Sequence, residues 1–158
     1  MTKADFLQNE LVSLLVKIPV NAAPLWGKMN VQNMVEHMSD SVRIANGRDP
    51  QDCITPDENL PKMQAFLYSD KPFKENTPNS LMPDTPAPSR FERMEDALGE
   101  LQSELNEFIN VFSQDKRKIN TNPFFGPLDF EAWTLLLYKH ALHHLRQFGV
   151  VPDFTVES

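Results

Sequence analysis

The sequence predicts an all-α protein, a four-helix bundle with a long crossover between helices two and three. Apolar residues recur at spacings of three and four in four separate segments, which is the period of an amphipathic helix. The chain has only five glycines, and no Asn-Gly or Asp-Gly turn joins alternating apolar runs, so β-hairpins have little to build on. Prolines concentrate between residues 48 and 88, which separates the second helical segment from the third.

The first two helices are marked by their caps. Thr2 and Asp5 form a helix start, and the apolar repeat behind them runs to Ile18, where Pro19 stops the helix. Asn30 is placed to cap the second helix, whose apolar face ends at Gly47.

Residues 48–88 form the crossover, because a proline-rich stretch excludes a long regular helix. We expect only a short helical turn or two over residues 58–68. A connection this long lets helices two and three run parallel, whereas a short loop joins antiparallel neighbours.

The third helix is predicted to start with a capping box of Ser89 and Glu92. Its apolar stripe runs from Phe91 to Phe112 and indicates a core seam rather than chemistry. Asp129 then caps a fourth helix that runs to about Phe148.

Length and composition predict a single domain over residues 1–158. The chain is 41% hydrophobic and 23% charged, as is typical of globular proteins. A net charge of -7 argues against nucleic-acid binding, which needs clustered Lys and Arg. No stretch approaches the ~20 apolar residues of a membrane span, and no signal peptide is recognisable. We therefore expect no membrane partner. The single cysteine, Cys53, indicates a reducing compartment, so we expect a cytoplasmic location.

Helix four carries the residues that indicate chemistry. His140 and His144 are four residues apart and share one helix face, the spacing with which a helix can hold a metal ion. A pair of core or surface histidines is the alternative for these two residues. His37 on the second helix would supply a third ligand and leave one coordination position open, as in catalytic sites. By itself it also fits a partly exposed surface histidine.

Other residues are candidates for supporting roles. His143 points away from the pair on the helical count, so we exclude it from the ligands. Gln147 lies one turn beyond His144 and could hydrogen-bond a ligand or simply make a polar contact. Asp40 is a weaker candidate for the same role.

Three segments resemble the DinB-like, YfiT-like superfamily of metal-dependent enzymes. They are residues 26–37, residues 122–126 and residues 140–149, and the resemblance covers most of the chain. It implies a four-helix bundle with this crossover and a divalent metal, for which zinc or nickel is the first choice, on His37, His140 and His144.

The resemblance implies a hydrolase or a thiol-dependent transferase that acts on a small molecule, with a low-molecular-weight thiol as a possible cosubstrate. Trp26, Phe124 and Phe125 would then wall an apolar pocket, although core packing is the simpler explanation for them. The alternative is a non-catalytic metal- or ligand-binding module involved in stress response. Helix four has a second apolar side, made by Leu135, Tyr138, Leu142 and Leu145. Neighbouring helices of the same bundle could cover it, but a homodimer would too, and we predict the homodimer.

Overall fold

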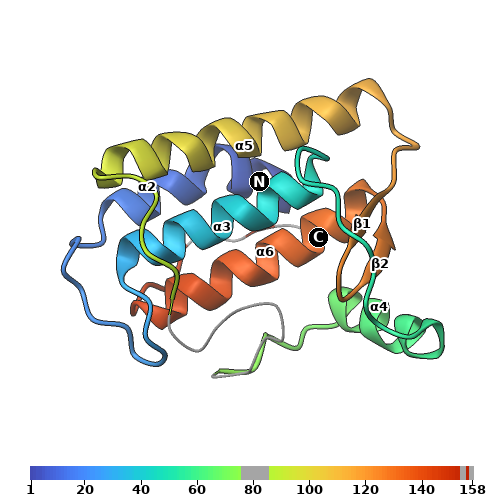
Figure 1. Ribbon diagram of the computed structural model, residues 1–158, viewed down its shortest axis with the longest axis horizontal. Helices are drawn as coiled ribbons and strands as arrows, with labels where there is room; N and C mark the ends of the chain where they lie inside the picture. The colour runs from blue at the N-terminus through green and yellow to red at the C-terminus, as the bar shows by residue number, and fades with distance from the viewer. Residues whose placement is uncertain (76–85, 154–155, 157–158) are drawn as a thin grey trace.

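A computed structural model describes residues 1–75, 86–153 and 156 of the chain (Figure 1). The middle of the predicted crossover, residues 76–85, therefore lies outside the described part. No helix within the described residues is long and apolar enough to cross a membrane.

The N-terminal segment is one continuous helical stretch. It consists of α1 (Lys3–Asp5), the π-helical segment η1 (Phe6–Glu10) and α2 (Leu11–Val16). The predicted start is confirmed, because the Thr2 hydroxyl accepts a hydrogen bond from the Asp5 amide and the Asp5 carboxylate accepts one from the Thr2 amide. The apolar repeat faces inward, so this stretch packs onto the core.

Helices α3 (Val31–Ala45) and α6 (Phe130–Gln147) begin at their predicted caps. The Asn30 side chain accepts a hydrogen bond from the Asn33 amide, and the Asp129 carboxylate accepts one from the Ala132 amide. Each cap satisfies a backbone donor that the first helical turn leaves without a partner.

Helix α5 (Met94–Gln114) starts later than the sequence predicted. Arg93 takes the N-cap position without a side-chain hydrogen bond, so the proposed capping box of Ser89 and Glu92 is wrong. The reason lies in the preceding chain, where the Arg90 amide donates to Glu36 Oε1 at 2.6 Å and the Ser89 hydroxyl accepts from Asn33. These bonds hold residues 89–90 against α3 and delay the helix.

The long helices lie side by side in a mostly helical molecule (Figure 1). The colour gradient shows that α3 and α5 run in the same direction, as the long crossover predicted, while α6 runs opposite to both. α3 contacts both α5 and α6, and the N-terminal stretch closes the other side by packing on α5 and α6. The core fills the space between these helices, and α3 packs directly beside α6.

A small antiparallel hairpin, β1 (Asn120–Asn122) and β2 (Gly126–Leu128), precedes α6 and corrects the expectation that hairpins would not form. Its loop is built from local chemistry, since Asn122 Oδ1 accepts the amides of Phe124 and Phe125. Gly126 closes the loop with a φ of 78°, a conformation that glycine adopts without strain.

The crossover contains a 3-10 turn, η2 (Asp57–Asn59), followed by α4 (Leu60–Tyr68). This confirms the short helical segment expected over residues 58–68. Gln64 of α4 donates to the carbonyl of Phe125 at 2.8 Å, which docks the crossover on the hairpin. Helix α4 also packs on α6, so the chain from residue 69 onward starts beside the fourth helix.

Candidate metal centre

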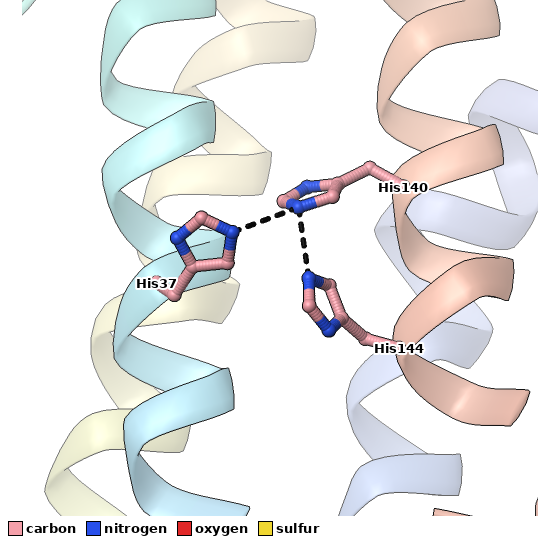
Figure 2. A group of neighbouring side chains, drawn as sticks. All are labelled: His37, His140 and His144. Carbon is pink, nitrogen blue, oxygen red and sulfur yellow. Dashed lines mark hydrogen bonds between the residues drawn. The ribbon is translucent and has the colours of Figure 1, made fainter. Parts of the chain in front are cut away.

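Three imidazole rings from two helices point toward one another (Figure 2). His37 comes from α3, and His140 and His144 come from successive turns of α6. Nε2 of His140 lies 3.0 Å from Nε2 of His37 and 2.9 Å from Nε2 of His144. One ligand nitrogen from each ring lies within 4.8 Å of the other two. Nitrogens that share a metal at about 2.1 Å are themselves about 3.0–3.4 Å apart, and the two contacts of His140 are close to that spacing, so this group could hold an ion.

Gln147 fixes the protonation of His144. Its amide nitrogen donates to the carbonyl of Trp26 at 3.0 Å, so its amide oxygen faces Nδ1 of His144 at 2.7 Å. Because that oxygen can only accept, Nδ1 carries the proton and Nε2 of the neutral ring keeps a free lone pair. A metal-binding histidine usually makes such a hydrogen bond with the ring nitrogen that does not bind the metal.

The hydrogen atoms of the three neutral rings cannot satisfy both short nitrogen contacts. His144 Nε2 has no hydrogen, and a neutral His140 Nε2 can either donate or accept but cannot do both. At least one of the two short nitrogen contacts is therefore not a normal hydrogen bond between neutral rings. A cation would satisfy this arrangement, since it accepts the lone pairs of all three rings together.

The three rings are held neutral by their surroundings. Burial lowers the pKa of His37 to about 4 and that of His144 to about 3, with neighbouring histidines adding to both shifts. Burial likewise puts the pKa of His140 well below its ordinary value. Neutral imidazole is the form that ligates metals, so the rings need not lose a proton at neutral pH. His144 is 5% exposed, whereas His37 and His140 are half-buried, so solvent reaches the group from their side.

Aromatic rings surround His143, the fourth histidine of this region. Its ring is not among the three that converge, in keeping with its exclusion from the predicted ligands. Trp26 lies with its ring centre 5.3 Å from that of His143, and Phe73 lies at 6.0 Å. Phe73 also meets the ring of His140 edge-on, at 6.3 Å. The sequence did not single out Phe73, because the proline-rich segment around it carries no periodic signal.

The two hairpin phenylalanines lie at different distances from the chemistry. Phe125 is buried and packs its ring against Phe73 and Phe66, each at 6.5 Å, so it backs the ring that meets His140. Phe124 is half-buried against the core, and its carbonyl accepts a hydrogen bond from Thr55. It thus fits core packing better than a pocket wall.

The side chains of Asp40 and Cys53 contact other residues rather than the three imidazoles. Arg90 pairs with Asp40 at 2.9 Å, with Glu100, and more distantly with the buried Glu36, so Asp40 belongs to a charged contact between the crossover and the helices. The Cys53 thiol is half-buried and lies 3.5 Å from the carbonyl of Thr55.

Comparison with known proteins identifies one family. The family model of the DinB superfamily matches residues 5–148, a span that includes all three converging histidines and Gln147. Searches of curated proteins and of solved structures found no match.

Proposed function

The chain belongs to the DinB superfamily, and we propose that it is a metal-dependent enzyme built as a DinB-like four-helix bundle. Its reaction would be a hydrolysis or a thiol-dependent transfer on a small molecule. The observation that carries the proposal is the close approach of three imidazoles between α3 and α6. Nε2 of His140 lies within 3.0 Å of Nε2 of both His37 and His144, and Gln147 holds His144 in the ligating tautomer.

The charge of the site supports chemistry at the ion rather than a purely structural role. All three candidate ligands are imidazoles, which bind metals as neutral rings, and no carboxylate belongs to the group within the described part of the chain. The protein would therefore leave the charge of a divalent ion uncompensated, which favours an anion as its remaining ligand. Three protein ligands also leave a coordination position for such a partner.

A divalent ion in this place would lower the pKa of a bound water or thiol and polarise the group that is attacked. The residues of the chain have separate tasks. His37, His140 and His144 would hold the ion, and Gln147 would orient His144. Three imidazoles suit several metals, of which we propose zinc or nickel.

Metal content of the untagged protein tests the proposal. Wild type should carry about one equivalent of a divalent metal, and His140→Ala should lose it while keeping its helical circular dichroism, because His140 contacts both other rings. His143→Ala is the matched control from the same helix and should retain the metal. Equal metal content in wild type and His140→Ala would refute the site.

The second candidate is a non-catalytic module that binds a metal or ligand, for example in stress response. The closed arrangement of the imidazoles favours it, since direct contacts link all three rings. The absorption spectrum of the cobalt-substituted protein separates the two candidates. A spectrum that changes on adding 2-mercaptoethanol supports an exchangeable position, and one that never responds supports the binding module.

A homodimer is proposed for the second apolar side of α6, although the chain itself covers much of that side. Leu145 is buried, and Tyr138 packs edge-on against Phe6 at 5.4 Å. Tyr138 and Leu142 remain half-buried at a groove that Val151 and Pro152 complete. Light scattering at micromolar concentration tests the assembly, because a mass near 18.1 kDa rather than twice that value would exclude it.

A further inference from the structure

The chain after α4 runs along α6 beside the imidazole group. Lys139, the residue before His140, donates from Nζ to the carbonyls of Ser69 and Lys71, at 2.7 and 2.5 Å. The same ammonium lies 4.9 Å from the ring centre of Phe66 on α4. Two charge-assisted hydrogen bonds and a cation–π contact thus pin residues 66–71 to the helix that carries two of the three imidazoles.

Phe73 follows two residues after the segment that Lys139 holds, and its ring lies at the site. Phe73 meets His140 and His143 edge-on, and it is supported from behind by Phe66 at 5.4 Å and by Phe125. Ring centres 4.5–7 Å apart are in direct contact, so no layer of water fits between Phe73 and His140. The ring therefore borders the group on the side where His37 and His140 keep some exposure, which we take as the approach for a ligand.

From this arrangement we infer that Phe73 is a specificity-determining residue, an apolar wall that limits the ligand on the metal to a small anion, and that Lys139 positions it. This inference rests on the proposed metal site. The ligand would be a monoanion, because the protein leaves the ion's charge uncompensated. It would carry a small apolar group, because the Phe73 side chain offers only carbon atoms for contact. A bulky substituent on the ligand would collide with Phe73.

Hydroxamate binding to the cobalt-loaded protein tests whether Phe73 limits the size of the ligand. Absorption titrations give the affinities for acetohydroxamate and benzohydroxamate, which share a ligating group and differ in bulk. Phe73→Ala should shift the ratio of the two affinities toward benzohydroxamate by about tenfold or more, and Phe73→Leu by less. Phe91→Ala removes another half-buried phenylalanine, one that lies beside Arg90, and should leave the ratio unchanged. The smaller Phe73→Leu change keeps the test available if the alanine variant unfolds.

Lys139→Met should shift the affinity ratio in the same direction and leave the cobalt spectrum unaltered. Lys62→Met, on the exposed side of α4, should leave the ratio unchanged. A structural defect alone would lower both affinities together and leave the ratio as it was. Identical ratios in wild type and both Phe73 variants would overturn the inference while leaving the metal site intact. Failure of the wild type to bind cobalt would instead overturn the proposed function, and the inference with it.

Discussion

At the scale of single residues, Gln147 is the clearest case of a side chain that acts through another. It is buried, its amide nitrogen is bound by the Trp26 carbonyl, and its oxygen holds the Nδ1 proton of His144. Gln147→Leu keeps the size and removes both bonds. We expect a metal affinity about 10–100-fold weaker with the helical content retained, because the tautomer of His144 is then no longer fixed. Competition with a chromophoric chelator measures the affinity.

Gln102→Leu is the matched control for that variant. Gln102 is a half-buried glutamine on α5 whose side chain donates to the Gln8 carbonyl at 2.8 Å and to Asn106 at 3.0 Å rather than to an imidazole. Its loss should affect stability without touching metal affinity. If the two variants bound metal as tightly as wild type, Gln147 would be only a polar contact of the core, the other role that its position in the sequence allowed.

How far single residues can be predicted depends on whether their signal is local. His140 and His144 are detectable because a spacing of four places two rings on one helix face. His37 lies 103 residues from His140, and only the packing of α3 on α6 brings their nitrogens to 3.0 Å. Phe73 could not be predicted, since its place is set by Lys139 binding carbonyls in another segment. Spacing in the sequence carries no information about such contacts.

At the scale of elements, the helix caps give the most direct prediction. The Asp129 carboxylate accepts the Ala132 amide at 2.9 Å and also lies at the positive end of α6. Asp129→Ala should lower the free energy of unfolding by about 1 kcal/mol, as other cap deletions do. Urea denaturation followed by circular dichroism measures the change. Asp52→Ala, an exposed aspartate of the crossover, should change it by much less, and equal losses in both variants would show that the cap is not the cause.

The two elements that the sequence mispredicted share a physical origin. The start of α5 is delayed because Arg90 binds Glu36, and the hairpin forms because α6 and α3 hold its strand, with Trp133 donating to the Asn120 carbonyl and Asn120 donating to the Ala45 carbonyl. In both places tertiary hydrogen bonds contribute to the local structure, and in the hairpin they add to the bonds that Asn122 makes within its own loop. Caps such as Asn30 were predictable because all their partners lie within three residues.

At the scale of the whole molecule, the crossover decides which helices become neighbours. Its length allows α3 and α5 to run parallel, and α6 then returns beside α3, opposite in direction (Figure 1). His37 therefore lies directly beside the two histidines of α6. The order of the helices was predictable from proline positions and apolar spacing, whereas the depth at which the imidazoles are buried was not. That depth governs how the whole fold responds to acid.

The metal-free protein should lose stability as the pH falls below about 6.5. An unfolded histidine takes up a proton near that pH, whereas the folded rings of His37 and His144 resist protonation down to about 4 and about 3. Above pH 6.5 both states are neutral and there is no penalty. Below it the unfolded state binds more protons, so each buried ring costs up to about 1.4 kcal/mol per pH unit until its folded pKa is reached. Urea denaturation of chelator-treated protein at pH 7.5, 6.5 and 5.5, above the range in which most carboxylates titrate, measures this slope. His144→Gln should flatten it, and parallel curves for the two proteins would show that the buried imidazoles do not control acid stability.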